Sequence, residues 1–410
     1  MPSETPSDPP SETPPDTPTP ARRTRRFTES VIRDMTRVAG EHGAINLAQG
    51  FPDFPAPDLL KDAACRAVRN DVNQYAITWG ARSLREAVAA KYDRLYGIPL
   101  DPDREITITC GATEAMVAAM LALVDPGDEV VVLEPFYENY GPDAILSGAS
   151  PLFLPLRPPE YRLDVDRLRK LVTSRTRALI LNTPNNPTGR VFDRREMEGV
   201  AEIARKRNLV VLTDEIYEHI VYGGRHIPMA TLGGMRTRTV TVSGLSKTFS
   251  ITGWRIGTVV APPKLTGAIR KVHDFLTVGA PAPLQEACAR GVNELAEGYY
   301  SELARGYEER RRILVDALQD AGFRCSPPEG AYYVLADYSE LSDADDHEFA
   351  RALARHAGVA AVPGSSFFRS PDDSGRSPPR RILRFAFCKK AETLREAGER
   401  LRSYASSSVA

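Results

Sequence analysis

A lysine surrounded by small residues is the feature of this chain with the clearest chemical potential. Lys247 lies in the run Ser-Gly-Leu-Ser-Lys-Thr-Phe-Ser-Ile-Thr-Gly-Trp-Arg-Ile-Gly, residues 243–257, directly after an apolar run that is typical of a strand. Small residues leave room for a bulky group beside an amine, and the guanidinium of Arg255 suits an anion such as phosphate. Taken alone, the same run also fits a solvated lysine in a turn.

Further polar residues stand after runs that are typical of strands. Gly111-Ala-Thr, Asn186, Asp214 and Lys247 each follow an apolar, β-branched run within a few residues. Helical patterns separate several of these runs, which predicts an α/β fold with a doubly wound, mostly parallel sheet flanked by helices. In such sheets ligands collect at the carboxyl ends of the strands. The runs are residues 106–109, 129–133, 178–181, 210–212, 240–242 and 256–260.

Composition divides the chain into a tail, a large domain and a smaller α+β domain. Residues 1–26 repeat Pro-Ser-Glu-Thr-Pro and have almost no apolar side chains, which predicts a disordered tail. Residues 61–297 carry the alternating strands and helices of the large domain. The small domain is expected to combine residues 27–60 with residues 298–410, which begin in a linking helix. Within it, residues 370–379 are rich in Ser, Pro, Gly and Asp and predict an exposed, mobile loop.

Two capping patterns predict where helices begin. Ser83 and Glu86 have the spacing of a capping box in front of a helix over residues 84–96. Asp193 and Glu196 form a second pair of the same kind, in front of a helix that extends to residue 207.

Charge and cysteine content exclude several classes of function. A formal net charge of −1 gives no reason to expect nucleic acid or an anionic membrane as a partner. The five cysteines are scattered without a CxxC pair, and no HExxH pattern is present, so we predict free thiols and no metal site. Neither a membrane span nor a signal peptide is recognisable. We therefore expect a cytoplasmic protein.

The lysine run resembles the signature of class I/II aminotransferases, the fold type I enzymes that use pyridoxal 5′-phosphate (PLP). The loop Ile-Asn-Leu-Ala-Gln-Gly-Phe-Pro-Asp-Phe-Pro-Ala-Pro, residues 45–57, resembles that of kynurenine/glutamine and methionine aminotransferases. The resemblance covers residues 28–405. It implies a large PLP-binding domain with a smaller α+β domain, and a Schiff base between Lys247 and the cofactor.

The resemblance implies a set of residues for the cofactor phosphate. Ala112 and Thr113 match phosphate-contact positions at the start of a helix, and Arg255 matches the phosphate cation. Many relatives have a serine three residues before the lysine, where this chain has Gly244. The neighbouring Ser243 is our candidate for the missing hydroxyl, which leaves this contact open.

A second set matches the positions around the cofactor ring. Asp214 matches the partner of the pyridine nitrogen, with Glu215 as its competitor, and strand alternation favours Asp214. Tyr217 and Asn186 match the two donors to the ring's 3′ oxygen. The aromatic residue that covers the ring is expected to be Tyr137. Phe136 is the alternative for that position.

The remaining matches concern the substrate and the oligomer. Arg384 matches the arginine that binds the substrate carboxylate, and an unpaired arginine inside an apolar strand pattern is otherwise costly. Asn186 and the backbone at Gly50 match positions that line the substrate site. Tyr75 matches a tyrosine that reaches the cofactor phosphate of the other subunit, which makes a homodimer part of the prediction. Side-chain pocket candidates are Phe51, Trp79, Tyr332 and Phe367.

The implied activity is transfer of an amino group between an L-amino acid and a 2-oxo acid, with Lys247, Asp214 and Tyr217 as catalytic residues. The pocket candidates favour apolar, sulfur-containing or aromatic amino acids, and residues 278–283 contain no second arginine motif for a dicarboxylate. A PLP-dependent β-lyase, or another non-transaminating enzyme on this scaffold, is the alternative. A non-catalytic PLP-binding regulator would need a DNA-binding module, which a 26-residue tail cannot hold.

Overall fold

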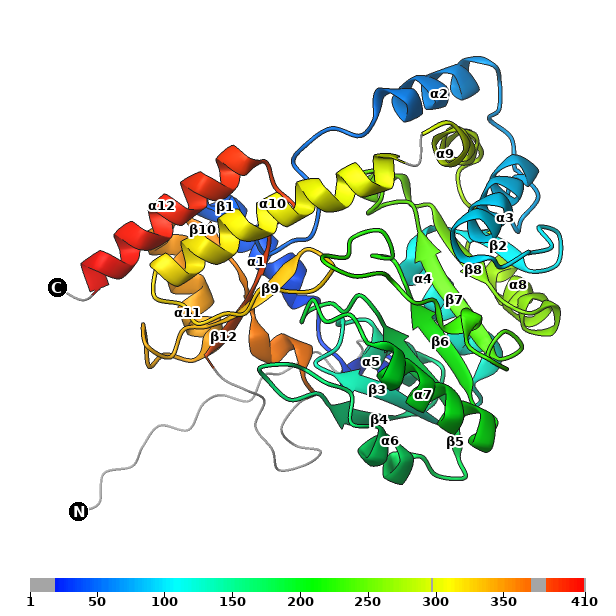
Figure 1. Ribbon diagram of the computed structural model, residues 1–410, viewed down its shortest axis with the longest axis horizontal. Helices are drawn as coiled ribbons and strands as arrows, with labels where there is room; N and C mark the ends of the chain where they lie inside the picture. Colours follow the sequence, from blue (N-terminus) through cyan, green and yellow to red (C-terminus); the bar gives the residue numbers. More distant parts are fainter. Residues whose placement is uncertain (1–18, 296–297, 370–380, 409–410) are drawn as a thin grey trace.

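The computed structural model describes residues 19–295, 298–369 and 381–408, arranged as a large lobe and a small lobe (Figure 1). The predicted mobile loop at 370–379 and most of the predicted tail lie outside these residues. The last residues of that tail, Arg22–Arg26, form an exposed 3₁₀ helix (η1) rather than disordered chain. The domain boundaries themselves stay predictions.

A seven-stranded sheet forms the centre of the large lobe, with strand order β2-β8-β7-β6-β5-β3-β4. All neighbouring pairs are parallel except those of β8, which runs antiparallel to β2 and to β7. The predicted fold class, α/β with a mostly parallel sheet, is therefore confirmed. The strands are β2 (Ile106–Thr109), β3 (Glu129–Glu134), β4 (Ser150–Pro155), β5 (Thr176–Asn182), β6 (Val210–Asp214), β7 (Thr239–Gly244) and β8 (Gly257–Val260).

Strand β4 is the one strand of this sheet that the apolar runs did not predict. Its sequence, Ser-Pro-Leu-Phe-Leu-Pro, contains two prolines, and its residues are mostly half-buried. Because β4 lies at the edge of the sheet beside β3, its free side tolerates prolines that a central strand would not.

Helices cover both faces of the sheet because alternate strand residues point to opposite sides. Val130 and Val132 face a core built with α4, α5 and α8, whereas Val131 and Leu133 face a core built with α6 and α7. Helices α2, α3 and α9 pack around a further core at the β2 edge (Figure 1). The helices are α2 (Asp58–Arg69), α3 (Arg82–Tyr96), α4 (Gly111–Leu123), α5 (Tyr140–Leu146), α6 (Val165–Leu171), α7 (Arg194–Arg207), α8 (Pro263–Thr277) and α9 (Ala282–Glu294).

The two capping predictions have opposite outcomes. At α7, the Asp193 side chain accepts from the Glu196 N–H and Glu196 accepts in return, so the predicted capping box is confirmed. At α3 the prediction was wrong. The helix already begins at Arg82, and the Ser83 hydroxyl donates to Glu286 at 2.8 Å instead of capping the helix.

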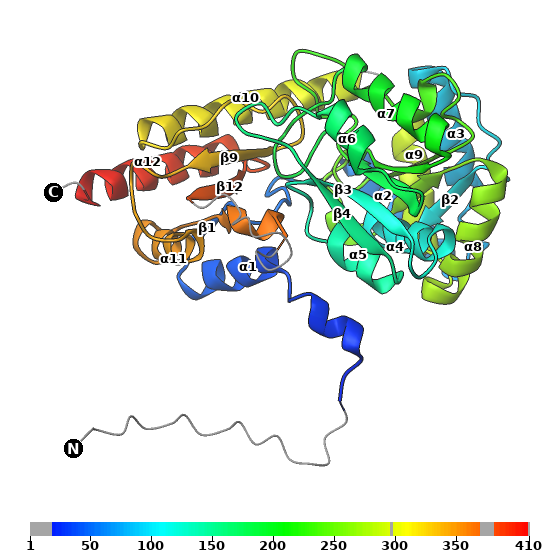
Figure 2. The same cartoon turned by 90° about the horizontal axis from the view of Figure 1, so that it is seen from below.

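The small lobe is α+β and combines an early segment of the chain with its C-terminal part. Strands β11, β12 and β9 form an antiparallel sheet, and β1 pairs with β10 in parallel. The 23-residue helix α10 extends from the side of α9 in the large lobe across to the small lobe, where it packs on α12 (Figures 1 and 2). The elements are α1 (Val31–Glu41), β1 (Ile45–Asn46), α10 (Gly298–Asp320), β9 (Tyr333–Asp337), α11 (Asp346–Ala352), a π-helical turn (Leu353–Ala357), β10 (Val359–Ala360), β11 (Val362–Pro363), a 3₁₀ turn (Gly364–Phe367), β12 (Ile382–Ala386) and α12 (Ala391–Ser408).

The two lobes together determine where a site can form. The carboxyl ends of the parallel strands β5, β6 and β7 meet at one edge of the central sheet, where β2 also ends. Strand β12 and the segment between β1 and α2 approach this edge from the small lobe, since Arg384 and Ala48 contact each other beside Asn186. Among the described residues, no helix is long and apolar enough to span a bilayer.

Candidate active site

A cavity of about 190 Å³ lies at this edge of the sheet, between the two lobes. Apart from the four candidates for the side-chain pocket, it brings together all but two of the residues that the sequence predicted for the site. The exceptions are Tyr75, which is 85 % exposed at a distance from the cavity lining, and Ser243. The predicted residues in the lining are Gly50, Ala112, Thr113, Tyr137, Asn186, Asp214, Tyr217, Lys247, Arg255 and Arg384.

Lys247 follows β7 and extends its amine into the cavity. Its Nζ donates to the Gly50 carbonyl at 3.1 Å and lies 5.7 Å from the centre of the Tyr332 ring. Burial is the main reason that the pKa of Lys247 is lowered to about 8, and the positive charges of Arg255 and Arg384 act in the same direction. An amine with this pKa is partly unprotonated near neutral pH, so it can act as a nucleophile and as a base.

Asp214, at the end of β6, presents a buried carboxylate to the cavity. Its Oδ2 accepts from the Tyr140 hydroxyl at 2.7 Å, and its Oδ1 accepts from the Ile216 N–H at 3.2 Å. Burial raises the pKa of Asp214, although these bonds and the nearby Lys247 oppose the rise. Burial and the neighbouring Asp214 also raise the pKa of Asp143, on α5, well above its usual range. A cationic group bound beside Asp214 would therefore stabilise its ionised form.

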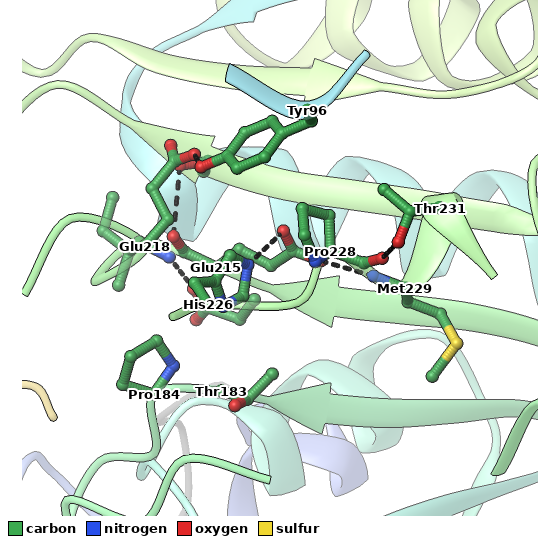
Figure 3. A network of polar contacts seen from close by, with 12 residues as sticks. Tyr96, Thr183, Pro184, Glu215, Glu218, His226, Pro228, Met229 and Thr231 are labelled. Carbon is green, nitrogen blue, oxygen red and sulfur yellow. Dashed lines mark hydrogen bonds and ion pairs between the residues drawn. The ribbon is translucent and has the colours of Figure 1, made fainter. Parts of the chain in front are cut away.

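Glu215, the competitor of Asp214, points to the other side of its segment. Its carboxylate lies 2.7 Å from Nε2 of His226 and accepts from the Met229 N–H at 3.4 Å. Figure 3 shows Glu215 and His226 together in a buried polar layer, with Glu218 and Tyr96 beside them. The Glu215 carboxylate thus has its own partners outside the cavity lining, as strand alternation predicts.

Ser243 is held in the same buried layer and does not reach the cavity. Its hydroxyl donates to Glu218 at 3.0 Å, and Glu218 also pairs with Lys91 at 2.6 Å. Burial is the largest single influence on Glu218 and opposes its charge, but Lys91, His219 and the Tyr96 hydroxyl together outweigh burial and hold the pKa of this carboxyl well below its usual range. The predicted place of Ser243 at the cofactor site was therefore wrong. Ser246, next to the lysine, lines the cavity instead.

A cluster of tyrosines from both lobes forms one wall of the cavity. The hydroxyls of Tyr217 and Tyr333 are 3.1 Å apart, and burial raises the pKa of Tyr217 well above its usual range, so this phenol keeps its proton. Tyr137 lines the cavity and meets the Tyr140 ring edge-on at 5.8 Å. Phe136, the alternative to Tyr137, stacks on Phe153 at 5.3 Å and lies outside the lining.

One end of the cavity has the features of an anion site. The backbone at Arg255 is left-handed (φ 56°), and its Nη1 donates to the Thr252 carbonyl at 2.9 Å. The guanidinium lies so close to the start of α4 that a Cβ on Gly111 would come within 2.2 Å of Nη2. Free N–H groups at the first turn of α4, with Ala112 and Thr113, converge there with the guanidinium, which is the arrangement that binds phosphate.

The other end of the cavity holds a second arginine in a different setting. Arg384 is fully buried, donates to Asn186 Oδ1 at 2.8 Å and to the Ala48 carbonyl at 2.6 Å, and is covered by the rings of Tyr333 and Phe367. In the described part of the chain, no carboxylate lies within ion-pair distance of it. A buried guanidinium without a counter-ion is costly, so this end suits an incoming carboxylate.

Gly50 forms the wall between Lys247 and the tyrosines. A Cβ at this position would lie 2.0 Å from the Tyr333 hydroxyl, so a side chain would displace that ring. The Gly50 carbonyl accepts from both Lys247 and the Tyr332 hydroxyl, the latter at 2.8 Å. The backbone at Gly50 thus contributes directly to the site.

The four side-chain pocket candidates lie outside the lining, and in this respect the prediction was wrong. Phe51 packs on Lys389 at 3.9 Å, Trp79 stacks on Arg270, and Tyr332 and Phe367 lie behind Lys247 and Arg384. Residues on α1 and after β3 line the cavity in their place, and no sequence pattern marks these residues because they are scattered along the chain. The lining residues that the sequence missed include Ile32, Arg33, Gln49, Met116, Glu138, Tyr140, Asp143, Asn182, Ser246 and Tyr333.

Comparison with known proteins identifies the class to which this site belongs. Residues 42–401 match the family model described as aminotransferase class I and II, so the chain belongs to that family. It is an aminotransferase, and the predicted transfer of an amino group between an amino acid and a 2-oxo acid is confirmed at that level. Within the described residues, no group of His, Cys, Asp and Glu is placed to hold a metal ion.

Individual relatives cover nearly the whole chain. A probable N-succinyldiaminopimelate aminotransferase of Mycobacterium tuberculosis is 41 % identical over 387 residues, covering 92 % of this chain and 97 % of the relative. The methionine aminotransferase of Escherichia coli is 40 % identical over 374 residues, with 91 % and 95 % covered. The solved structure of the Mycobacterium tuberculosis N-succinyldiaminopimelate aminotransferase matches with a TM-score of 0.90 at 41 % identity, covering 94 % of this chain and 100 % of that chain.

Proposed function

We propose that the cavity holds PLP, with Lys247 as the residue that binds it covalently. The start of α4 and Arg255 would hold the phosphate, Asp214 would pair with the protonated pyridine nitrogen, and Tyr217 and Asn186 would donate to the ring's 3′ oxygen. The observation that carries this proposal is the meeting in one cavity of an amine of lowered pKa, a buried carboxylate, and Arg255 and Arg384, neither of which has a carboxylate partner among the described residues. A buried carboxylate beside a cationic ring nitrogen, and an anion beside Arg255, would each remove an electrostatic cost.

Bound PLP would supply the electron-withdrawing ring that makes the Cα proton of an amino acid acidic. The residues of the chain provide the rest. Arg384 and the Gly50 backbone orient the substrate carboxylate, and Lys247 Nζ accepts the Cα proton and returns it. Tyr217 keeps its proton and serves as a hydrogen-bond donor, while Asp214 stays ionised beside a cation. Tyr137 would cover the ring from the side of β3.

The amino donors that we propose are apolar, sulfur-containing or aromatic amino acids. Ile32, Met116, Tyr137, Ile216 and Tyr333 give the cavity apolar and aromatic walls. The names of two relatives agree with this class, since one is a methionine aminotransferase and another is a human kynurenine–oxoglutarate transaminase, 34 % identical over 402 residues.

We also propose a homodimer in which Tyr75 reaches the phosphate site of the partner subunit. Tyr75 is 85 % exposed in the segment between α2 and α3, where a monomer gives it nothing to pack on. Ile77 in the same segment and Phe275, Leu276 and Val278 at the end of α8 are exposed as well. These segments are adjacent, because His273 lies 2.8 Å from the Thr78 carbonyl, so they form one apolar face of the kind that mediates association.

Chemical trapping tests the role of Lys247. Borohydride reduction of the PLP-loaded protein should fix the cofactor on Lys247, located by peptide mass, and Lys247→Ala should lose both the label and turnover. Lys389, a second buried amine near the cavity, is the matched competitor. A label on Lys389, or turnover in the Lys247 variant, would contradict the assignment.

Product analysis separates transamination from the β-lyase alternative. With an amino donor and a 2-oxo acid, a transaminase forms a new amino acid and releases no ammonia. Conversion of a β-substituted amino acid to ammonia and pyruvate over multiple turnovers, without any oxo acid acceptor, would favour the lyase.

A substitution in the exposed apolar face tests the dimer. Phe275→Asp should yield a monomer in sedimentation with weakened PLP binding, whereas an unchanged dimer would rule out this face.

A further inference from the structure

A cation that the proposed chemistry does not use lies in the wall of the active-site cavity. Arg33, in the first turn of α1, is exposed, and it lines the same cavity as Arg384 and Lys247. It belongs to the N-terminal turn of an 11-residue helix, where the helix dipole adds positive potential. An exposed arginine is usually a solvated surface charge. Whether Arg33 can bind an anion in the cavity depends on whether a carboxylate of the protein already pairs with it.

Neighbouring charges on α1 are paired, but Arg33 is not. One turn further on, Arg37 pairs with Asp34 at 3.1 Å and with Glu29 at 3.5 Å, and Asp34 also pairs with Arg351 at 2.5 Å. Among residues 19–295, 298–369 and 381–408, no carboxylate lies within ion-pair distance of the Arg33 guanidinium. Asp34 is thus occupied by two other arginines, and Arg33 remains available to an anion in the cavity.

The start of α1 is held in place at the cavity by contacts to both walls. The Ser30 side chain caps the helix by accepting from the Arg33 N–H, and its hydroxyl donates to Glu138 at 2.5 Å. Further along the helix, the Thr36 hydroxyl donates to Gln49, another lining residue, at 3.0 Å. The backbone at Arg33 is therefore fixed, whereas its long side chain is free to turn toward the cavity or away from it. Glu138, the acidic residue of this wall, is engaged by Ser30.

We propose that Arg33 binds the distal carboxylate of a dicarboxylic substrate, so that the amino acceptor is a 2-oxo dicarboxylic acid. This inference rests on the proposed function, since Arg384 is taken to bind the α-carboxylate. Arg384 and Arg33 then each bind one of the two carboxylates of the substrate. When an apolar amino acid enters, the exposed Arg33 side chain turns to solvent, which explains how one cavity accepts both kinds of substrate. The absence of an arginine from residues 278–283 is no obstacle, because α1 supplies the charge.

Arg33→Met tests the proposal, because it keeps the chain length and removes the charge. With methionine as donor, kcat/KM for 2-oxoglutarate should fall about fivefold to thirtyfold, as for loss of a charge-assisted hydrogen bond at a half-open site. The value for phenylpyruvate, a 2-oxo acid whose side chain is uncharged, should stay within about twofold. Arg33→Lys should recover part of the loss. Arg37→Met, one turn along the same helix and outside the cavity lining, is the matched control and should change neither value.

A binding measurement makes the result independent of turnover. Calorimetric titration of the PLP-loaded protein should give tighter binding for glutarate than for butyrate, and Arg33→Met should remove that difference. Equal losses for 2-oxoglutarate and phenylpyruvate, unchanged 2-oxoglutarate kinetics, or equal affinity for glutarate and butyrate in the wild type would each overturn the proposal. Failure of the wild type to transaminate any donor would instead overturn the proposed function. The glutarate titration would still show whether Arg33 binds the distal carboxylate.

Discussion

The two ends of the cavity use the same kind of side chain in opposite ways. Arg255 is exposed, and its partners among the described residues are two backbone carbonyls of the large lobe, those of Thr252 and Cys110. Arg384 is fully buried and joins the lobes, since it lies on β12 and bonds to Asn186 after β5. Within one subunit, the first end lies in the large lobe alone, whereas the second end exists only while the two lobes are correctly placed.

This difference suits the two kinds of anion that we propose for the ends. A phosphate that stays bound needs a preformed cradle, which α4 and Arg255 provide without help from the small lobe. A substrate carboxylate binds and leaves in each turnover. Because the Arg384 end depends on how the two lobes are placed, its geometry can change when the carboxylate binds. The comparison predicts that variants at the two ends separate cofactor affinity from substrate affinity.

Arg255 and Arg384 both lower the pKa of Lys247, so its charge depends on both ends of the cavity. In the cofactor-free protein its pKa is lowered from 10.5 to about 8, mainly by burial. Lys247→Met should therefore stabilise this form below pH 8, by on the order of 3 kcal/mol in the free energy of unfolding. Between pH 8 and 10.5 the folded wild type holds fewer protons here than the unfolded chain, so its stability rises and the advantage of the variant shrinks.

Denaturant titrations across that pH range measure the effect. Lys264→Met, which replaces an exposed lysine on α8, should leave stability unchanged at every pH. A constant difference between Lys247→Met and the wild type from pH 7 to pH 11 would contradict the lowered pKa.

Arg384→Lys should separate the two ends most clearly. It keeps the charge but loses the planar fork, and a lost charge-assisted bond of about 1.5–3 kcal/mol lowers kcat/KM for all amino acids about tenfold to a hundredfold. PLP affinity should change little. Amines without a carboxylate, followed by half-reaction absorbance, should escape the penalty. An earlier melt with equal losses for carboxylated and decarboxylated substrates would indicate a structural arginine instead.

Arg255→Gln should give the opposite pattern. Loss of one charge-assisted bond to phosphate, about 1.5 kcal/mol, weakens PLP binding about tenfold. The substrate KM at saturating PLP should stay within about twofold of the wild type. Equilibrium dialysis of PLP and steady-state kinetics together check this, and a change in substrate KM alone would break the comparison.

The smallest effect is expected from a contact that ties the lobes together away from the cavity. Glu329, before β9, pairs with Arg190 of the large lobe at 2.5 Å. Glu329→Gln weakens a half-exposed pair worth about 0.5–1 kcal/mol, so substrate KM should rise about twofold to fivefold while PLP affinity is unchanged. Glu198→Gln, which breaks an exposed pair within α7, is the control and should affect neither quantity.

The large-lobe end could be predicted from the sequence almost completely. Lys247, Asp214 and Gly111 each follow a strand run, and parallel strands place such residues at one edge without further information. The same logic distinguished Asp214 from Glu215. Ser243 was a candidate only because it neighbours Gly244, where many relatives have a serine. Its side chain instead faces the buried layer of Glu218.

The part of the site that depends on the small lobe was harder to predict. Arg384 was found because a charge in an apolar strand needs an explanation, but Tyr333 and Arg33 carry no such signal. Tyr140, the partner of Asp214, was missed because α5 is only seven residues long and its pattern is too short to read. The residues of this wall come from α1, β9 and β12, which meet only through tertiary packing.

Asn186 has a consequence that reaches beyond either end. Its Oδ1 accepts from Arg384, and its backbone N–H is held by Asn182 at 2.7 Å, so the free face of the amide is the NH₂ group. If that group serves the cofactor, one rigid amide is shared by two ligands, and thermodynamic reciprocity follows. If a given cofactor form changes the affinity of the protein for a carboxylate by some factor, the bound carboxylate must change the affinity of the protein for that cofactor form by the same factor.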